Sequence, residues 1–80
     1  MIKKNKDTYK LIAQNIQYAL DYNKEHADSP IKLVSIEVSR GVYNIGEEKI
    51  MNEVKKLVEG NFSLRLKDND YYCCIFVTIK

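Results

Sequence analysis

The last ten residues of the chain are almost continuously apolar, β-branched or aromatic. They read Tyr-Tyr-Cys-Cys-Ile-Phe-Val-Thr-Ile-Lys over residues 71–80. A strand that is apolar on both faces normally lies in the interior of a sheet, between two other strands. The sequence therefore predicts a small sheet in which the last strand is the central one.

Size and charge bound the classes of protein to which the chain can belong. It has 80 residues, with 13 Lys and Arg against 11 Asp and Glu and a formal net charge of +2. We expect residues 1–80 to form one small domain, with residues 1–6 as a flexible basic arm. Dedicated nucleic-acid-binding domains usually carry a larger basic excess. Residues 1–6 lack the apolar segment of a secretory signal, and no run is long enough to span a bilayer, which indicates the cytoplasm.

Two adjacent cysteines, Cys73 and Cys74, lie within the apolar run, and they are the two cysteines of the sequence. Successive side chains of a strand point to opposite faces, so these thiols cannot easily form a disulfide with each other. We therefore expect both to be reduced and to act as small apolar residues.

Residues 7–24 have the spacing of an amphipathic helix. Asp7 can serve as its N-cap, and Pro30 prevents the helix from continuing. Tyr18 and Tyr22 lie on a second stripe beside the apolar face, where they are either the margin of the core or a second contact patch. The apolar face itself consists of Tyr9, Ile12, Ala13, Ile16, Ala19 and Leu20.

Residues 46–59 have the pattern of a second helix. Asn44 and Glu47 resemble a capping box, and Gly60 suits a left-handed C-cap. Its buried stripe is predicted to be Ile50, Met51, Val54, Leu57 and Val58.

Three segments have the pattern of strands. Residues 32–39 and 62–67 alternate apolar and polar side chains, residues 71–80 form the apolar run, and residues 68–70 supply a turn. A right-handed crossover makes the first two strands parallel, and a hairpin makes the third antiparallel to the second. With the most apolar strand in the centre, this order predicts an α+β fold: a two-layer α/β sandwich of order α-β-α-β-β. Its three-stranded mixed sheet has the strand order first-third-second, a split β-α-β arrangement, with both helices on one face.

The opposite face of this sheet is predicted to lack a cover, because both helices are used on the first face. Tyr72, Cys74 and Phe76 would form an exposed ridge there, with Arg65 and Lys67 at its rim. Exposed patches of this kind usually mark a contact surface. The full set that alternation places on this face is Ser35, Glu37, Ser39, Ser63, Arg65, Lys67, Tyr72, Cys74, Phe76, Thr78 and Lys80.

Three interpretations of this face are open. An aromatic centre with a charged rim is typical of an interface with a protein partner or with a second copy as a homodimer, and Tyr72, Phe76, Arg65 and Lys67 would carry the contact. Alternatively, single-stranded nucleic acid could stack on the two aromatic rings while the cations meet phosphates. The third interpretation is that residues 1–6 or a loop fold over the face.

Other candidate sites are weaker. Arg40 and Gly41 open a loop that leads into a helix N-terminus, which could hold an anion, although glycines in such loops usually serve turns. His26 is the single histidine, and it reads as a solvated residue at a helix end. No zinc spacing, nucleophile elbow or phosphate-binding loop is present. We expect no metal, no cofactor, no small-molecule substrate and no enzymatic activity.

The leading interpretation is a small non-enzymatic binding module that acts by macromolecular contact through its open sheet face. Abundant Lys, Asn, Ile and Tyr, with two Arg and no Trp, resemble the products of AT-rich bacterial or phage genomes. A regulator or inhibitor of a host protein, encoded by a phage or mobile element, fits these features. The alternative is a small nucleic-acid-binding protein that uses the same face and the basic residues 1–6.

Overall fold

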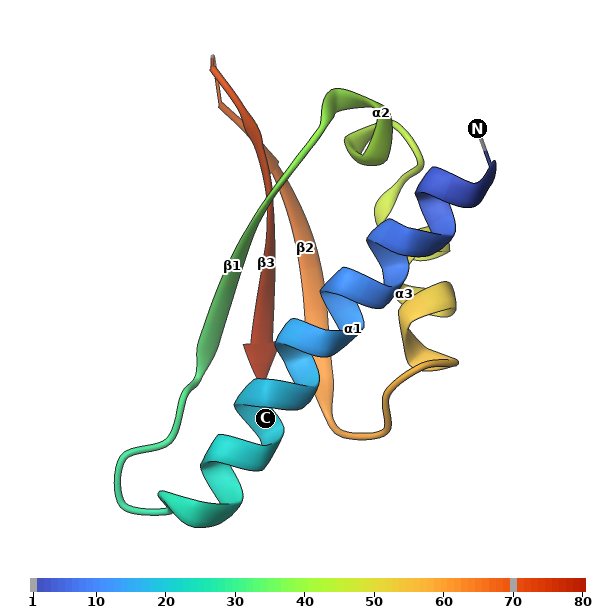
Figure 1. The fold of residues 1–80 in the computed structure, drawn as a ribbon. Helices are drawn as coiled ribbons and strands as arrows, with labels where there is room; N and C mark the ends of the chain where they lie inside the picture. Colours follow the sequence, from blue (N-terminus) through green and yellow to red (C-terminus); the bar gives the residue numbers. More distant parts are fainter. Residues whose placement is uncertain (1, 70) are drawn as a thin grey trace.

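The computed structural model describes residues 2–69 and 71–80, with side chains from residue 7 onward. The order of long elements confirms the predicted α-β-α-β-β arrangement, and a short additional helix follows the first strand (Figure 1). The elements are α1 (Ile2–Glu25), β1 (Leu33–Val38), α2 (Arg40–Tyr43), α3 (Glu47–Lys55), β2 (Phe62–Asp68) and β3 (Cys73–Ile79).

The last strand, β3, is central, as its apolar sequence predicts. The strand order is β1-β3-β2, and both neighbours run antiparallel to β3. At the centre of the sheet, Ile75 lies opposite Ile36 on β1 and Leu66 on β2. β1 and β2 therefore point the same way, as expected, but they do not pair with each other, so the sheet is antiparallel rather than mixed.

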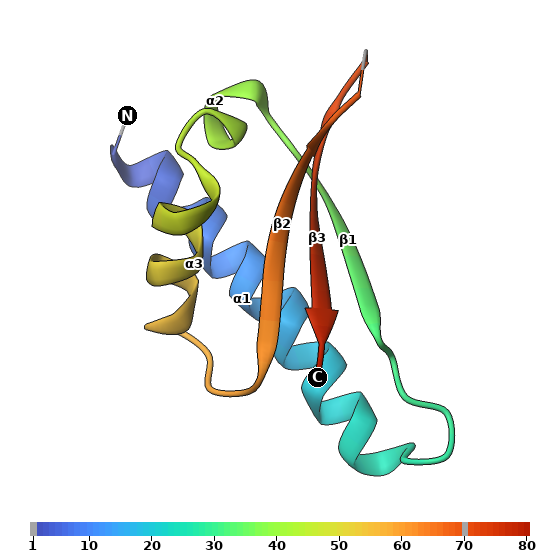
Figure 2. The same cartoon turned by 180° about the vertical axis from the view of Figure 1, so that it is seen from behind.

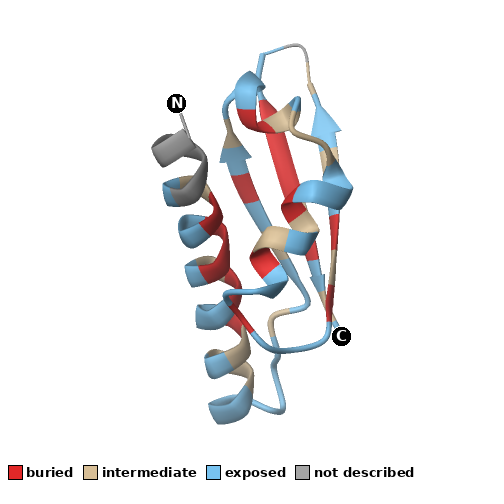
Figure 3. Ribbon diagram, turned by 90° about the vertical axis from the view of Figure 1, so that its right-hand side faces the viewer, coloured by how far each residue is buried: buried red, intermediate tan, exposed pale blue. Residues whose placement is uncertain are grey.

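The long helices α1 and α3 lie on one face of the sheet (Figures 1 and 2). α1 packs on β1 and β3, whereas α3 packs on β2 and against α1. Figure 3 shows the buried residues of α1 as a stripe that faces the sheet. This is the predicted two-layer sandwich, in which one face of the sheet has no helix over it.

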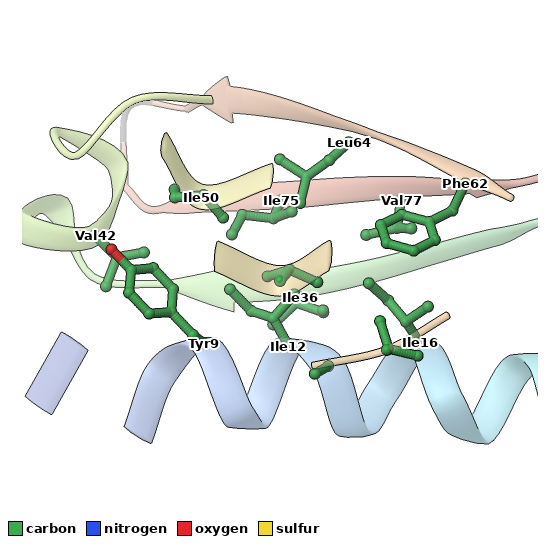
Figure 4. Close-up of a cluster of buried hydrophobic side chains, with 13 residues drawn as sticks. Tyr9, Ile12, Ile16, Ile36, Val42, Ile50, Phe62, Leu64, Ile75 and Val77 are labelled. Carbon is green, nitrogen blue, oxygen red and sulfur yellow. The ribbon is translucent and has the colours of Figure 1, made fainter. Parts of the chain in front are cut away.

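Branched aliphatic side chains form the centre of the core (Figure 4). Ile12 and Ile16 of α1 reach toward β1 and β3, where Ile75 and Val77 are fully buried. Burying one such side chain contributes roughly 1.5–3 kcal/mol. The buried core of the described residues comprises Tyr9, Ile12, Ala13, Ile16, Ile36, Val42, Ile50, Val54, Val58, Phe62, Leu64, Ile75 and Val77.

The start of α1 differs from the prediction. The helix begins at Ile2, so the backbone of residues 2–6 belongs to α1 and is not the expected arm. Asp7 lies inside the helix and is not its N-cap. No glycine or proline precedes Asp7, and lysine is a good helix former, so nothing in the sequence forces the helix to start there.

The segment before α3 also differs. Residues 40–43 form α2, capped by Ser39, whose hydroxyl accepts a hydrogen bond from Val42 N–H at 3.3 Å. The predicted Asn44–Glu47 capping box is wrong, because Gly46 is the N-cap of α3 with φ 101° and no side-chain cap. Burying Val42 in the core explains the extra turn, which points that side chain inward.

α3 is shorter than predicted, and its end is different. The helix stops at Lys55 with Lys56 as its C-cap, so Gly60 is not the C-cap and lies in the loop before β2. The turn after α3 buries Val58 and leaves Leu57 half exposed, although Leu57 was predicted to be in the core. At Gly60 a Cβ atom would lie 2.8 Å from the Leu20 side chain, which explains a glycine at this close approach.

One polar side chain of α1 fixes the start of β1. The Asn23 amide accepts a hydrogen bond from Ile31 N–H at 2.6 Å and donates one to Ile31 C=O at 2.9 Å. The Asn23 side chain thus binds both backbone groups of Ile31, as a residue of a neighbouring strand would. These two hydrogen bonds fix the segment before β1 against the C-terminal half of α1.

Candidate interaction surface

The face of the sheet without helices is the candidate site, and Figure 2 views the molecule from this side. We call it the open sheet face. Strand alternation and the register of both strand pairs place these side chains on it: Leu33, Ser35 and Glu37 from β1, Cys74, Phe76 and Thr78 from β3, and Ser63, Arg65 and Lys67 from β2.

The centre of this face is formed by β3. Phe76 lies between Ser35 and Arg65 in the register, and Cys74 lies between Glu37 and Lys67. Arg65 is exposed, and Phe76 is partly buried. Side chains directly opposite each other in antiparallel strands are close enough to contact, so the long Arg65 side chain is placed to cover part of the ring.

Of the predicted exposed ridge, Tyr72 is exposed, Phe76 is partly buried and Cys74 is buried. Cys74 is only 5% exposed although no helix covers it. Its small thiol stands between the longer side chains of Glu37 and Lys67, which can exclude water from it. The exposed apolar surface is therefore split between the two ends of the face.

Tyr72 marks the hairpin end of the face. It lies just before β3 and is 43% exposed. Asn69 N–H donates a hydrogen bond to Tyr72 C=O at 2.8 Å, which continues the β2–β3 pairing toward the turn. The adjacent Tyr71 is 95% exposed.

Leu33 lies at the other end of the face and was not among the residues predicted there. It lies opposite Thr78 and is 58% exposed. The alternation that places Ser35 and Glu37 on this face also reaches Leu33 when it is extended back by two residues. That pattern was the signal that could have identified it.

The rim of the face is mainly cationic. Arg65, Lys67 and Lys80 are all exposed, and Glu37 is the acidic residue nearest to them in the register. Within residues 7–69 and 71–80, the ion pairs are formed by other side chains. These three cations are thus available to a partner with acidic groups.

Tyr18 and Tyr22 lie elsewhere, on α1 in the helical layer. Their rings are 6.4 Å apart, and Tyr22 stacks on His26 with ring centroids 4.0 Å apart. Tyr18 is 67% exposed. The sheet separates these rings from Phe76, so the structure does not bring the two predicted patches together.

Arg40 contacts an anion of its own chain. Its Nη1 donates to Asp68 Oδ2 at 2.7 Å, which ties α2 to the end of β2. This hydrogen bond and the charge of Arg40 lower the pKa of Asp68, against the effect of desolvation, and the bond raises the pKa of Arg40. Gly41, predicted with Arg40 as an anion contact, lies inside the short helix α2.

The two cysteines are free and lie on opposite sides of β3. Cys73 faces the helices and is 2% exposed, with its Sγ 3.8 Å from Asp68 Oδ1. Burial raises the pKa of the Cys73 thiol, and Arg40 partly opposes that rise. Both thiols therefore behave as small packed side chains.

A groove lies between α1 and the turn that follows α3. Lys10, Gln14 and Gln17 of α1 line it, together with Leu57, which is half exposed. Within the described part of the chain, no three His, Cys, Asp or Glu side chains gather as metal ligands would.

No described helix is both long and apolar enough to cross a membrane. No protein-family model, curated protein or solved structure matches this chain significantly.

Proposed function

We propose that this protein is a non-enzymatic binding module that holds a partner protein on its open sheet face. The observation that carries the proposal is the one-sided cover of the sheet, which leaves β3 between the core and solvent. Exposed apolar faces on small soluble proteins usually serve as contact surfaces. A role as a cytoplasmic regulator or inhibitor of a host protein, encoded by a phage or mobile element, matches the size and composition.

The chemistry of the face supports a protein partner. Tyr72, Phe76 and Leu33 supply aromatic and aliphatic area, and aromatic residues with Arg are enriched where binding energy concentrates in protein interfaces. Arg65 and Lys67 stand beside this area and remain exposed. The partner that fits is a protein surface with apolar groups opposite Tyr72, Phe76 and Leu33 and with acidic residues near Arg65 and Lys67, because opposite charges steer such encounters.

Site-specific photo-crosslinking tests the proposal. A benzoylphenylalanine residue at position 76 should yield a defined protein adduct in extract of the native host. The same residue at position 55, exposed on α3, is the matched control and should yield none. Arg65→Glu combined with Lys67→Glu should abolish the position-76 adduct. Equal adducts at both positions, or none at position 76, would refute the proposal.

Nucleic acid is the competing occupant, and salt separates the two. Single-stranded and duplex oligonucleotides should not be retarded by the wild-type protein at 50 or 200 mM salt. Binding that weakens by orders of magnitude between these concentrations indicates phosphate contacts. If the wild-type protein shows such binding and the Arg65→Glu, Lys67→Glu variant does not, the open sheet face binds nucleic acid and the protein-binding proposal is wrong.

A further inference from the structure

The outer edge of β1 has backbone N–H and C=O groups that are not paired with another strand. Ile79 N–H donates to Lys32 C=O at 2.9 Å, which makes residues 32 and 79 a hydrogen-bonded pair. In an antiparallel ladder such pairs alternate, so the N–H and C=O groups of Leu33, Ser35 and Glu37 point away from β3. Among the described residues, no hydrogen bond joins the backbone of these three residues to another element.

The opposite edge of the sheet is protected. There the outward groups are those of Phe62, Leu64 and Leu66, because Lys80 N–H pairs with Asn61 C=O. Glu47 of α3 accepts the outward N–H of Leu66 at 3.3 Å, and α3 packs beside this strand. Edges that are covered in this way resist pairing with another chain. β1 is therefore the edge at which pairing can occur.

Between residues 8 and 26, the flank of α1 next to this edge has no formally charged side chain. Lys10 and Gln17 face the groove beside α3, and Leu11, Tyr18 and Tyr22 lie on the opposite flank, toward β1. Leu11 is 52% exposed and Tyr18 67% exposed. Figures 1 and 2 show the C-terminal half of α1 beside the start of β1. Leu11, Tyr18 and His26 are the exposed positions of this flank, and Thr8, Asn15 and Tyr22 are partly buried.

We propose that two copies of this chain pair through the β1 edge and form a two-fold symmetric dimer with a continuous six-stranded sheet. The occupant is a second copy because β1 is complementary to itself. When Ser35 of one copy lies opposite Ser35 of the other, Leu33 of each copy lies opposite Glu37 of the other. No like charges then lie opposite each other. All outward groups of the strand then find partners in one antiparallel ladder.

The two ends of the free edge select this register. A shift in one direction would pair Glu37 with Ile31, whose N–H and C=O are already bound to Asn23. A shift in the other direction would pair Leu33 with Ser39, whose C=O accepts from Tyr43 N–H at 3.0 Å. The Ser35-centred register alone uses the whole free edge.

The flank of α1 between residues 8 and 26 fits the same symmetry. The two-fold axis of this pairing is perpendicular to the sheet, so both copies of α1 lie on the same side of the joined sheet. Each presents Leu11, Tyr18 and Tyr22 toward the axis. Apolar and aromatic surface without charge is the composition expected at the centre of an interface. The inference does not depend on the proposed function, and it would join the two open sheet faces into one surface.

Ser35→Pro tests the pairing directly, with Ser35→Ala as its matched control. Proline removes the outward N–H, and it is tolerated on an edge strand where that N–H does not serve the native ladder. We expect sedimentation equilibrium to show a wild-type dimer, an unchanged Ser35→Ala dimer, and dimerisation at least about tenfold weaker in Ser35→Pro, since each copy loses a hydrogen bond. A monomeric wild-type protein at 200 µM, or an undiminished Ser35→Pro dimer, would overturn the inference.

A charge on the α1 flank provides a second test that cannot act by unfolding the core. Tyr18→Glu should weaken dimerisation because it buries a carboxylate near its symmetry mate. Gln17→Glu adds the same charge one residue away, toward α3, and should leave dimerisation unchanged. Equal effects of the two substitutions would contradict the assigned flank.

Amide hydrogen exchange gives a readout specific to the register. β3 protects the amides of Val34 and Ile36 in both monomer and dimer. The amides of Leu33, Ser35 and Glu37 should be protected only in the dimer, and their protection should fall on dilution. Protection of these three amides that does not change with concentration would refute pairing between copies. The face variant Tyr72→Ala with Phe76→Ala should leave this protection intact, which separates failure of the inference from failure of the proposed function.

Discussion

The two phenylalanines of the chain provide the sharpest test of a sheet covered on one face only. Phe62 points into the core and is 6% exposed, whereas Phe76 lies on the open sheet face and is partly buried. Phe62→Ala leaves a cavity between the layers and should cost about 3–5 kcal/mol. Phe76→Ala loses its cross-strand contacts with Ser35 and Arg65, worth roughly 0.2–1 kcal/mol each, and some burial. We expect about 1–2 kcal/mol for it.

Urea denaturation followed by far-ultraviolet circular dichroism measures both costs, at one fixed protein concentration because association contributes to stability. The whole domain should have about 4–12 kcal/mol of stability at 80 residues. Phe62→Ala can therefore approach complete unfolding, and Phe62→Leu keeps the comparison measurable at a smaller cost. If Phe76→Ala costs as much as Phe62→Ala, the open face is covered within the monomer and the reasoning behind the proposed function is wrong.

Three further predictions concern single contacts. Asn23→Ala should lower the free energy of unfolding by about 1–3 kcal/mol in urea denaturation, since two backbone hydrogen bonds are lost, whereas the exposed α3 control Asn52→Ala should cost almost nothing. Gly60→Ala should cost about 1 kcal/mol or more in the same assay, because φ is +153° there and the new Cβ meets a side chain; an unchanged midpoint would contradict this. Arg40→Gln should raise the pKa of Asp68 in an NMR titration, since Arg40 holds it below its usual range. Because that folded-state pKa is lowered, the pair stabilises the protein at neutral pH and its contribution is lost as the pH falls through the pKa; a pKa unchanged by the substitution would refute the assignment.

Periodicity in the sequence was enough to predict most of the fold. The apolar run of β3 predicted its central place, and alternation in β1 and β2 predicted which side chains face the helices. Ile12, Ile16, Ile50 and Val54 followed from helical spacing and are all fully buried. These patterns succeed because burial of apolar area is the largest favourable term in folding, and it acts on every turn and strand.

Element ends could not be predicted from the same patterns. α1 starts before Asp7 and α3 ends at Lys55, because a capping residue permits a helix end without requiring one. The extra helix α2 depends on Val42 reaching the core, which is a tertiary contact.

The candidate surfaces divide in the same way. Alternation alone placed Phe76, Arg65 and Lys67 on the open sheet face, and helical spacing alone placed Tyr18 and Tyr22 on a helix flank. Only the tertiary structure showed that the flank adjoins the free edge of β1, that Cys74 is buried, and that Arg40 already holds Asp68. The reason is physical: a residue's facing direction is set by its own backbone period, whereas its neighbours across the sheet are set by register and by which helix covers which strand.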